Sequence, residues 1–563
     1  CPKCKFCKTE LVKAYELLEN ITLGIGTQGT LEKLSTLVEN KDENAKCNLG
    51  KSALLPLETA LDIFKKEFVE HAIYKYCRAS SCENLFLSSC GNSCPGAVDL
   101  PGTIGLMQKG LFVEAVALGR ETNPFFLSCG RICEEPLCQK YCKRQIIDEP
   151  INSPALHRYA GEMAAKESGS LSSALDFPTL KPTTKTDKKI AIIGAGPAGL
   201  SAAYFLARFG HKAVIFEKLP VSGGMLRIGI PDYRLPPEIL SEEINHILSL
   251  GVEINYNVEV GKDISFLDLK EKYDAVYIAV GACKNNTLDI PGENLDGVLG
   301  GIEFLRKINL KEDVNIGMKV AVVGGGNVAI DAARSSLRMG AKEVSIIYRR
   351  NLKDMPAALK EIQACQKEGI NILTMVNPVE IISKNGRKTA KLEKMIPGAF
   401  DLDGRRKPEK SNEYLEIEID TFIIAIGQTP EIGFLKQNGI ETKWQQVKID
   451  KSNFRTNLKG VFAGGDCVLG PATAIEAIGH GRKAAIAIHK FLMKEKEPQF
   501  TNLRNSLKNF IAPCDSRQLQ QQQPEQLDIR ERIKNFNEVE KPFTKTQAQK
   551  EMMRCICSAK TGL

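Results

Sequence analysis

The sequence has no apolar run close to the ~20 residues that a membrane-spanning helix requires. It has no block of lysine and arginine and no basic stretch interleaved with aromatic residues, although Lys and Arg outnumber Asp and Glu by 76 to 68. No charged stretch followed by an apolar segment, the pattern of a signal peptide, precedes the first motif. We therefore expect no membrane span, no nucleic-acid partner and a cytoplasmic location.

The organisation of the chain changes several times along its length. At 563 residues it is too long for one hydrophobic core, and at about 100–200 residues per domain it holds roughly three to five domains. Residues 1–75 and 76–180 are cysteine-rich with helical patterns, and a polar linker follows them. Two strand–glycine–helix units then begin at Lys189 and Val320. The polar, glutamine-rich residues 501–563 predict a solvated arm.

The cysteines are concentrated at one end of the sequence, since twelve of the 18 lie in the first 142 residues. The rest of the chain has the pattern of an intracellular nucleotide-binding enzyme, whose reducing surroundings keep thiols free for metals rather than disulfides. A Cys-x-x-Cys-x-x-Cys run with one remote cysteine can supply the four thiolates of a 4Fe-4S cluster, and the motif alone could instead bind zinc. The residues of this first set are Cys1, Cys4, Cys7 and Cys47.

Two further groups of four cysteines follow. They are Cys77, Cys82, Cys90 and Cys94, and then Cys129, Cys133, Cys138 and Cys142. The simplest interpretation gives each group its own 4Fe-4S cluster, so we expect about three clusters in all. Cys555 and Cys557 are either the first residues of a further cluster domain or ordinary free thiols.

The first strand–glycine–helix unit has the pattern of a dinucleotide site. Gly194, Gly196 and Gly199 form a G-x-G-x-x-G motif between an apolar strand and a helix-like segment. Such glycines allow a tight turn and a close approach of the backbone, so that a pyrophosphate rests on the positive end of the helix. Glu217 ends the next strand, where a carboxylate can accept hydrogen bonds from ribose hydroxyls.

The second unit differs at the end of its second strand. Its loop contains Gly324, Gly326 and Asn327, and alanine replaces the third glycine, which still allows close packing. Arg349 and Arg350 stand where the first unit has a carboxylate. A guanidinium can bind a 2′-phosphate through two hydrogen bonds, so we predict FAD in the first unit and NADPH, rather than NADH, in the second.

Seven short motifs occur in one order along the chain: Gly194–Gly199, Gly223–Pro231, Gly324–Asp331, Tyr348–Arg350, Met355–Ala357, Ala425–Gly427 and Ala463–Asp466. With them, residues 77–489 resemble the small, NADPH-oxidising subunit of bacterial glutamate synthase. They also resemble the N-terminal part of dihydropyrimidine dehydrogenase and the large subunit of NADH-dependent ferredoxin:NADP oxidoreductases. The resemblance implies an α/β fold with two Rossmann-like domains preceded by two helical iron–sulfur domains.

The resemblance also implies domain bounds and residue roles. An FAD-binding domain would span 188–314 and 425–500, and an NAD(P)H-binding domain 315–424. FAD would be held by Glu217, Gly223, Gly224, Arg227, Gly465, Asp466 and Thr473, and the nicotinamide nucleotide by Gly324, Gly326, Asn327, Arg349 and Arg350.

The resemblance to dihydropyrimidine dehydrogenase implies that the second and third cysteine groups interleave. One cluster would be held by Cys77, Cys82, Cys90 and Cys142, and its neighbour by Cys94, Cys133 and Cys138. The family completes the second set with a glutamine or glutamate, and the matching position here is His157. Histidine would raise the potential of that cluster, as in Rieske centres, whereas the alternative leaves His157 on a helix surface. Cys129 would then be spare.

The first 75 residues resemble a different family. The Cys1–Cys7 run, Gly24-Ile-Gly26 and Cys47-Asn-Leu-Gly50 are similar to the C-terminal cluster domain of the NADH-oxidising flavoprotein subunit of complex I. Because the glutamate synthase subunit lacks this part, we expect an oxidoreductase subunit that passes electrons from NADPH through FAD and 4Fe-4S clusters to a partner subunit or ferredoxin-like protein in a hetero-oligomer.

Two alternatives remain at this point: a glutamate synthase small subunit proper, and a non-catalytic cluster-carrying scaffold. A dithiol reductase is not expected, because Cys283, Cys365 and Cys467 are isolated and form no Cys-x-x-Cys pair. Hydride transfer needs no side chain as acid or base, so we expect no catalytic residue of that kind.

Overall fold

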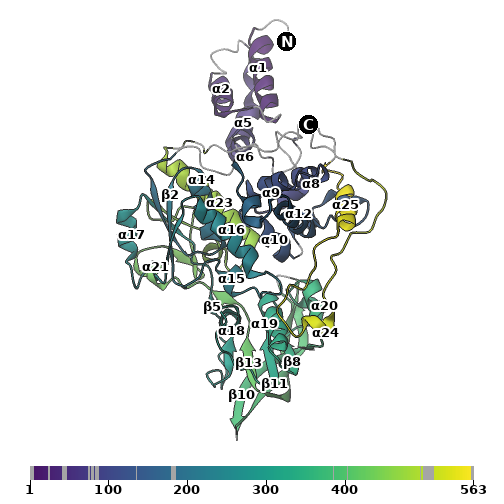
Figure 1. Ribbon diagram of the computed structural model, residues 1–563. Coiled ribbons are helices and arrows are strands. Elements are labelled where there is room, and N and C mark those ends of the chain that lie inside the picture. The colour runs from purple at the N-terminus through teal and green to yellow at the C-terminus, as the bar shows by residue number, and fades with distance from the viewer. Residues whose placement is uncertain are drawn as a thin grey trace.

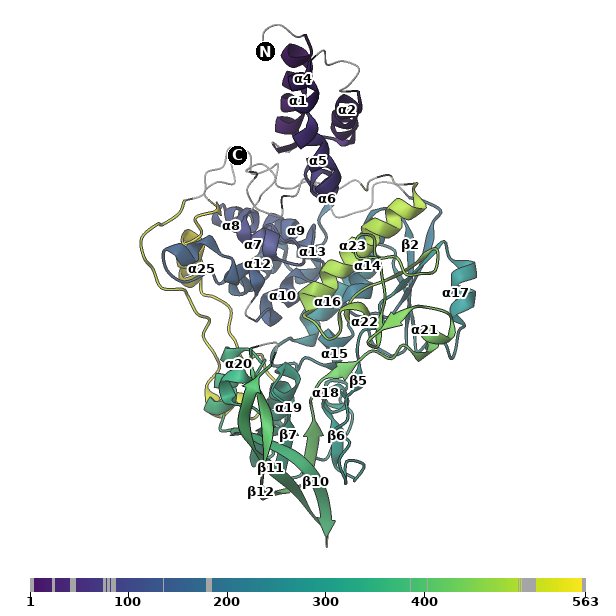
Figure 2. The same ribbon diagram turned by 180° about the vertical axis from the view of Figure 1, so that it is seen from behind.

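The structure, a computed structural model, describes residues 5–22, 26–40, 47–73, 77, 82, 88–134, 136–178, 185–384, 386–401, 404–494, 496, 498 and 513–558. Cys1 and Cys4 lie outside these residues, and Cys7 falls within the first helix. None of the described helices combines the length and the apolar composition needed to cross a lipid bilayer. The described chain forms two helical bodies, two parallel sheets and a C-terminal arm (Figures 1 and 2).

The N-terminal helical body projects away from the rest of the chain (Figure 1). Its helices are α1 (Lys5–Thr22), α2 (Gln28–Glu39), α4 (Asn48–Ser52), α5 (Leu55–Ile63) and α6 (Lys65–Ala72). Thr27 begins α2 with a reciprocal cap, in which its hydroxyl accepts from the Thr30 amide and its own amide donates to the Thr30 hydroxyl. Ile21, Leu34 and Leu54 are buried between the helices, so this small body has its own apolar core.

The eight cysteines from Cys77 to Cys142 lie within the second helical body or beside it. Its helices are α7 (Ser89–Ser93), α8 (Leu100–Gln108), α9 (Phe112–Arg120), α10 (Phe126–Ile132), α11 (Leu137–Lys140), α12 (Ser153–Ser168) and α13 (Leu171–Leu175). Helix α12 contacts α9, α10 and α13. It begins at the cap Asn152 and ends at Gly169, whose φ of 79° favours glycine. This central helix therefore orders the loops that carry the cysteines.

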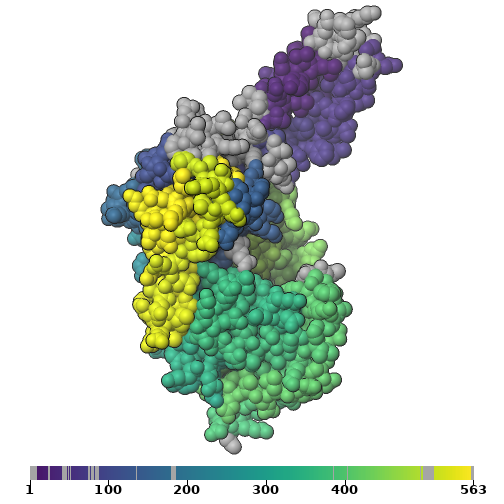
Figure 3. Space-filling model, turned by 90° about the vertical axis from the view of Figure 1, so that its right-hand side faces the viewer, coloured from purple at the N-terminus to yellow at the C-terminus, as the bar shows by residue number. Residues whose placement is uncertain are grey.

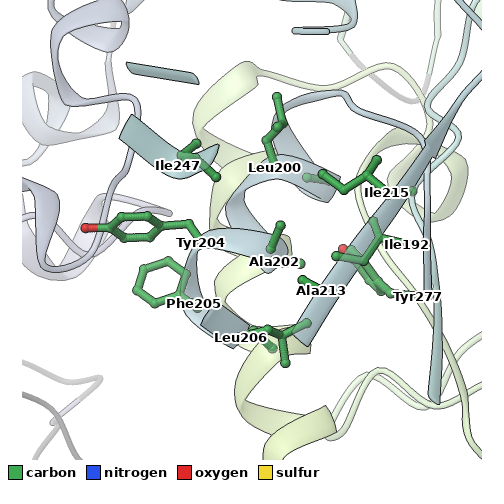
Figure 4. Packing of buried hydrophobic residues seen from close by; sticks show 14 of the residues in the cluster. Ile192, Leu200, Ala202, Tyr204, Phe205, Leu206, Ala213, Ile215, Ile247 and Tyr277 are labelled. Carbon is green, nitrogen blue, oxygen red and sulfur yellow. The ribbon is translucent and has the colours of Figure 1, made fainter. Parts of the chain in front are cut away.

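The first parallel sheet has the strand order β17-β4-β1-β2-β3. The strands are β1 (Lys189–Ile193), β2 (Lys212–Glu217), β3 (Glu253–Tyr256), β4 (Ala275–Ile278) and β17 (Val461–Ala463). Helices α14 (Pro197–Arg208) and α23 (Ala474–Leu492) pack together beside the sheet, with Leu200, Ala202 and Leu206 in the core (Figure 4). The strand order reverses between β1 and β4, which is where such sheets bind ligands.

Shorter helices border this unit: α15 (Met225–Ile228), α16 (Pro237–Ser249), α17 (Phe266–Lys272), α21 (Gly433–Gln437) and α22 (Asp466–Leu469). Small residues allow α14 and α23 to approach closely. A Cβ atom on Gly481 of α23 would lie 2.3 Å from the Ala198 carbonyl oxygen of α14. Glycine is therefore required at this helix contact.

The second parallel sheet has the order β6-β13-β7-β8-β9. Its strands are β6 (Val298–Gly300), β7 (Lys319–Val323), β8 (Glu343–Tyr348), β9 (Asn371–Thr374) and β13 (Thr421–Ile424), with helices α18 (Gly301–Asn309), α19 (Asn327–Arg338) and α20 (Leu359–Lys367). Because β6 pairs with β13, this sheet begins before residue 315, and the predicted boundary at 314/315 is too late. The parallel pairing with β13 assigns β6 to the second unit.

An antiparallel sheet extends the second unit. It consists of β10 (Val376–Lys384), β11 (Arg387–Phe400) and β12 (Arg406–Ile419) in that order. The two-residue strands β5 (Lys284–Asn285) and β14 (Gln428–Thr429) pair where the chain passes between the two parallel sheets. A second short pair, β15 (Thr442–Lys443) and β16 (Gln446–Val447), lies in the first unit.

The C-terminal arm is packed against the protein, so the expectation of a solvated arm is wrong for residues 513–558. Figure 3 shows the arm lying along the second helical body and reaching the second sheet unit. Its helices are α24 (Ile529–Arg532) and α25 (Lys545–Met553), and α25 contacts α8 and α12. The arm is polar in composition but still packs against the protein, because its buried charged groups are ion-paired. A composition argument cannot detect such pairing.

Two ion-pair groups connect the arm to both bodies. Glu538 binds Arg131 and Arg158 of the helical body, each at 2.9 Å. Arg532 of the arm lies 2.9 Å from the buried carboxylate of Glu368 in the second unit. Glu368 also pairs with Arg334 at 2.8 Å and Arg338 at 3.0 Å. The carboxylate of Glu368 is therefore in contact with three guanidinium groups, those of Arg334, Arg338 and Arg532.

We expect Glu368→Gln to lower the midpoint of thermal unfolding by several degrees, because removing one partner of a buried ion pair costs about 3–5 kcal/mol. Burial alone raises the pKa of Glu368, but hydrogen bonds and charges from Arg334 and Arg338 outweigh it and lower the pKa to about 2 from an ordinary 4.5. The stabilisation is present above 4.5 and is lost as the pH falls toward 2.

The matched control is Glu343→Gln, since Glu343 is 70% exposed and lies 4.0 Å from Lys319. Differential scanning calorimetry between pH 3 and pH 7 measures both variants. Equal midpoints for the two variants at pH 7 would contradict a stabilising role for Glu368.

Candidate functional site

One cavity of about 800 Å³ connects the first sheet unit, the second unit and the cysteine-rich body. It lies at the carboxyl ends of β1, β2 and β4, where the strand order reverses. Its lining includes Gly196 after β1, Asn327 at the start of α19 and Cys133 after α10. Residues from three parts of the chain therefore face one space.

Each of the three glycines in the first loop has a different structural role. Gly194 has a φ of 103°, which disfavours any side chain. A Cβ atom on Gly199 would lie 2.0 Å from the Gly194 carbonyl oxygen, so α14 packs too closely on the loop for another residue. At Gly196 the nearest atom to such a Cβ is the Gly224 Cα, 3.9 Å away. The backbone at Gly196 is therefore open toward the cavity.

Two carboxylates face the same cavity: Glu217 is buried and Asp466 is partly buried. Glu217 accepts hydrogen bonds from the amides of Ala195, at 2.7 Å, and Leu219, at 2.9 Å. Burial raises the pKa of Glu217, and these two bonds oppose the increase. Asp466 has a buried Oδ1 without a hydrogen-bond partner among the described residues, and burial raises its pKa to about 7. Asp466 therefore offers an unsatisfied acceptor to a ligand.

The other predicted residues of the first unit fall into two groups. Gly224 and Thr473 line the cavity, and Thr473 begins α23 as a cap together with Glu476. Arg227 instead donates to the Pro237 carbonyl at 3.2 Å and the Ser241 hydroxyl at 2.7 Å. Gly223 and Gly465 have φ values of 117° and 72°, so they shape the loops beside the cavity.

The second glycine loop is also open where a ligand would lie. Gly324 has a φ of 141°, and a Cβ atom there would be 2.2 Å from the Ala425 carbonyl oxygen. No atom lies within 4 Å of a Cβ placed on Gly326, which is the open position of this loop. Asn327 accepts from the Ala358 amide at 3.2 Å and also lines the shared cavity.

The two predicted arginines lie just beyond β8 in different surroundings. Arg349 is exposed to solvent. Arg350 donates to the Asp401 carboxylate at 2.8 Å, and both of these side chains are largely buried. Asp401 follows β11, about fifty residues later in the chain, and no local sequence signal indicates that it meets Arg350. The carboxylate of Asp401 holds the Arg350 guanidinium in place.

Four cysteines and a histidine of the second helical body line the large cavity: Cys94, Cys129, Cys133, Cys138 and His157. Cys283 of the first unit also borders this cavity. His157 stacks on Phe126 with ring centroids 4.2 Å apart, and its buried Nε2 has no hydrogen-bond partner among the described residues. Burial lowers the pKa of His157 to about 3, so the ring is neutral, which is the form that binds metals. The alternative that leaves His157 on a helix surface is therefore wrong.

The remaining cysteines form separate groups. Cys90 and Cys142 line a second, smaller pocket, which Cys138 also borders. The ligand atoms of His71, Cys77 and Cys82 lie within 4.8 Å of one another, although the sequence analysis did not single out His71. Cys47 accepts a hydrogen bond from the Gly50 amide at 3.3 Å. The two cysteine runs are thus mixed in space rather than gathered as consecutive fours.

Sequence analysis also missed a buried ion-pair group at the junction of the bodies. Arg234, from the first unit, lies 2.7 Å from Asp331 of α19 and also pairs with Glu134 of the helical body. Burial raises the pKa of Glu134 to about 7, while the charge of Arg234 opposes the increase. Asp331 stands within a recognised motif, but Arg234 and Glu134 carry no sequence signal of their own.

The geometry fits the cofactors that the motifs imply. Both glycine loops leave open space where a pyrophosphate would rest, and Asp466 supplies an unpaired acceptor for a hydroxyl group. Thiols and a neutral, unpartnered imidazole face the same cavity, and thiolates and imidazoles are the ligands of iron–sulfur clusters. The site is therefore suited to dinucleotides and iron–sulfur clusters together.

Comparison with known families supports this description. Residues 188–481 match the pyridine nucleotide-disulphide oxidoreductase family. Residues 60–169 match the 4Fe-4S domain II of dihydropyrimidine dehydrogenase, and residues 1–71 match the iron–sulfur binding region of the F subunit of NADH-ubiquinone oxidoreductase. The resemblances inferred from the motifs, and the α/β fold preceded by helical iron–sulfur domains, are confirmed.

Curated relatives extend over most of the chain. The NADPH-Fe(3+) oxidoreductase subunit beta of Geobacter sulfurreducens is 34% identical, over 99% of this chain and 88% of the relative. The NADP(+)-dependent formate dehydrogenase subunit beta of Moorella thermoacetica is 36% identical, over 84% and 71%. The glutamate synthase [NADPH] small chain of Escherichia coli is 32% identical, over 78% and 96%. The chain belongs to the pyridine nucleotide-disulphide oxidoreductase family, as an FAD-dependent NAD(P)H oxidoreductase with 4Fe-4S cluster domains.

Proposed function

We propose that the chain takes hydride from NADPH in its second unit and delivers electrons through its 4Fe-4S clusters to a partner subunit in a hetero-oligomer. The observation that carries this proposal is the shared cavity, which joins both glycine loops to the thiols of Cys94, Cys133 and Cys138. FAD, when bound, accepts two electrons together and releases them one at a time. The residues of this chain would bind and orient NADPH, FAD and the clusters.

The first loop and its neighbours would hold FAD. Gly196 leaves the backbone open to a pyrophosphate, while Gly194 and Gly199 shape the turn. Glu217 would accept from ribose hydroxyls in addition to its two backbone amides. Asp466 would accept from the ribityl chain through its unpartnered Oδ1. Thr473 and Gly224 would contact the flavin from the cavity wall.

Arg227, Gly223 and Gly465 would act less directly. Arg227 fastens the loop after β2 to α16 through Pro237 and Ser241, so it would position Gly223 and Gly224 rather than contact the flavin. Gly465, with its positive φ, directs the chain into α22 at Asp466.

The second loop would hold NADPH. Gly326 leaves space for the pyrophosphate while Gly324 shapes the turn, and Asn327 lies at the start of α19, where the helix dipole favours negative charge. Arg349 and Arg350 would bind the 2′-phosphate, with Asp401 orienting Arg350. Because Asn327 also lines the flavin cavity, the nicotinamide would approach the flavin from this side.

The cluster nearest the flavin site would use Cys94, Cys133, Cys138 and His157. All four line the large cavity, and the orphaned Nε2 of His157 favours it over Cys129 as the fourth ligand. Cys90 and Cys142 would belong to a neighbouring cluster, because they share the smaller pocket. Cys1, Cys4, Cys7 and Cys47 would hold a third, as the match of residues 1–71 suggests.

The same N-terminal match favours an electron-transfer complex over glutamate synthesis. The Escherichia coli glutamate synthase relative aligns with 78% of this chain, whereas the Geobacter sulfurreducens relative aligns with 99%. Three relatives are named as a subunit or small chain of a larger enzyme, which supports a hetero-oligomer. A vestigial scaffold is disfavoured, because both glycine loops are complete and open.

The proposed function is tested by anaerobic stopped-flow spectroscopy of the reconstituted protein. NADPH should bleach the flavin absorbance near 450 nm, on the order of 1–1000 s⁻¹, and faster than NADH does. Iron analysis should find about twelve irons per chain for three clusters. Flavin that neither nucleotide reduces would contradict the oxidoreductase proposal, and faster reduction by NADH would contradict the choice of NADPH.

Arg349→Ala combined with Arg350→Ala should raise the KM for NADPH by roughly 10–100-fold, because a hydrogen bond to a charged group contributes about 1.5–3 kcal/mol. The KM for NADH should change little, since NADH carries no 2′-phosphate. Arg387→Ala, at an exposed arginine that begins β11, is the control. An equal loss of affinity for both nucleotides would contradict recognition of the phosphate.

His157→Cys should lower the midpoint potential of one cluster by on the order of 100 mV, because a thiolate adds negative charge where the imidazole is neutral. EPR spectroscopy during a redox titration measures this shift and assigns it to one signal. Cys129→Ser should leave the same signal unchanged. A shift in Cys129→Ser together with an unchanged spectrum of His157→Cys would identify Cys129 as the fourth ligand.

Asp466→Asn should stabilise the flavin-free protein more at pH 8 than at pH 5. Burial raises the pKa of Asp466 to about 7 from an ordinary 3.8, so the folded protein retains a proton that the unfolded chain has lost between these values. Stability therefore falls as the pH rises through this window, and the asparagine removes that loss. Thermal unfolding at several pH values measures the effect, with the exposed Asp62→Asn as control.

The same variant should bind FAD more weakly, because Asn presents one acceptor oxygen where the carboxylate presents two. A pH-independent difference in unfolding midpoint between Asp466→Asn and the wild type would contradict the buried, protonated carboxyl.

A further inference from the structure

Two cysteines of the C-terminal arm lie beside two cysteines of the second helical body. Cys555 and Cys557 line the smaller pocket together with Cys90 and Cys142, more than 400 residues earlier in the sequence. The pKa of the Cys90 thiol is raised mainly by burial, and the thiols of Cys555, Cys142 and Cys557 raise it further. The fold has therefore gathered two thiols of the arm and two of the second helical body around one pocket, which Cys138 also borders.

The four thiols are suited to iron rather than to a disulfide or a single small ion. All four are reduced cysteines. Among the described residues, the group whose ligand atoms lie within 4.8 Å of one another, as around one ion, is at His71 and does not include these thiols. A 4Fe-4S cubane takes one thiolate on each iron and therefore holds its ligands farther apart than a mononuclear metal does. Apolar Leu100, Ile104 and Ile151 also line the pocket.

A buried ion-pair network fixes both cysteine-bearing segments. Arg554, which precedes Cys555, lies 2.9 Å from Asp148. Arg144, two residues after Cys142, lies 2.6 Å from the other oxygen of the same carboxylate. The side chains of Arg144 and Arg554 are completely buried. One carboxylate therefore holds the two segments together at the positions where their thiols meet.

Further hydrogen bonds anchor helix α25, which ends just before these cysteines. Glu551 binds Arg554 at 2.7 Å and accepts from the amides of Asn152, at 2.7 Å, and Gln522, at 2.8 Å. Gln108 donates to the carbonyls of Pro513 and Met552. The arm is thus an integral part of this body, and Cys555 and Cys557 belong to an anchored segment.

Charge at the pocket agrees with a bound cluster. A cubane with four thiolates carries net negative charge, which costs free energy in an apolar pocket without nearby cations. Lys143, directly after Cys142, borders the pocket, and so does Arg144, whose charge is paired with Asp148. Each thiol would give up its proton when it binds iron, as metal ligation requires.

The resemblance to dihydropyrimidine dehydrogenase assigns Cys77 and Cys82 to this cluster, but these two cysteines do not line the smaller pocket. Cys77 and Cys82 gather with His71, at the junction between the two helical bodies. The pKa of Cys82 is raised to about 11, mainly by burial and then by a hydrogen bond with Cys77, so these two thiols interact with each other. The smaller pocket thus contains two of the four family ligands and two thiols from the arm.

We propose that Cys555 and Cys557 complete, with Cys90 and Cys142, the ligand set of one 4Fe-4S cluster, which the C-terminal arm closes. This inference rests on the proposed function in that the chain carries clusters in its second helical body. It deepens that function by assigning two ligands outside the matched cluster domain, which ends at residue 169.

The test compares three variants of the full chain after anaerobic reconstitution with iron and sulfide. They are Cys555→Ser with Cys557→Ser, Cys77→Ser with Cys82→Ser, and Cys514→Ser, an exposed cysteine of the same arm. The arm double variant should lose about four irons per chain and one EPR signal of the reduced protein. Cys514→Ser should keep both, and the Cys77/Cys82 double variant should keep the signal that the arm variant loses.

Full iron content in the arm double variant would overturn the proposal. So would loss of the same EPR signal in the Cys77/Cys82 double variant, which would return those residues to this cluster. Circular dichroism checks that each variant folds.

Alkylation of the unmodified holoprotein gives an answer that does not depend on the variants. Iodoacetamide should modify Cys514 readily, and Cys555 and Cys557 only after a chelator has removed iron, as read by mass spectrometry of peptides. Modification of all three at equal rates before iron removal would overturn the proposal. Reduction of the flavin by NADPH in the unmodified chain tests the proposed function separately, since it can succeed or fail whatever the ligands of this cluster are.

Discussion

The Arg234 guanidinium is the contact on which the arrangement of the three bodies depends. It extends from the first sheet unit and pairs with Asp331 of the second unit and Glu134 of the helical body. The Tyr233 hydroxyl also donates to Asp331, at 3.3 Å. Breaking a buried pair leaves an uncompensated charge, so each body constrains the other two. The shared cavity exists because these charges are satisfied only when all three bodies meet.

The features predicted from sequence are those that depend on near neighbours. Gly194 and Gly199 are required by the turn they occupy and by each other, and Glu217 follows about twenty residues later on the adjacent strand. A local motif is enough to identify such residues, because the strand–loop–helix unit brings them together whatever the rest of the chain does. The two strand–glycine–helix units and the open positions over Gly196 and Gly326 follow from this short-range pattern.

The features that sequence analysis missed depend on distant segments. Asp401 meets Arg350 only because the antiparallel sheet, whose strand β10 contacts β8, brings the end of β11 back to the end of β8. The arm lies against the helical body through Glu538 and Glu551. Its polar composition suggested a solvated segment, but each of these carboxylates is paired with an arginine or with backbone amides. Composition gives the number of charges in a segment, but it does not show whether other parts of the fold supply partners for them.

The same long-range packing determines the order in which the cluster sites lie. Cys138 lines both the large cavity and the smaller pocket, so the two sites are neighbours that share a wall. The large cavity is lined by residues that we propose hold FAD, whereas the smaller pocket is lined in part by Cys555 and Cys557 of the arm. Electrons that leave the flavin site would therefore meet the Cys94, Cys133 and Cys138 group before the Cys90 and Cys142 group. Through Arg532 the arm also binds Glu368 of the second unit, so one segment contacts both that unit and the smaller pocket.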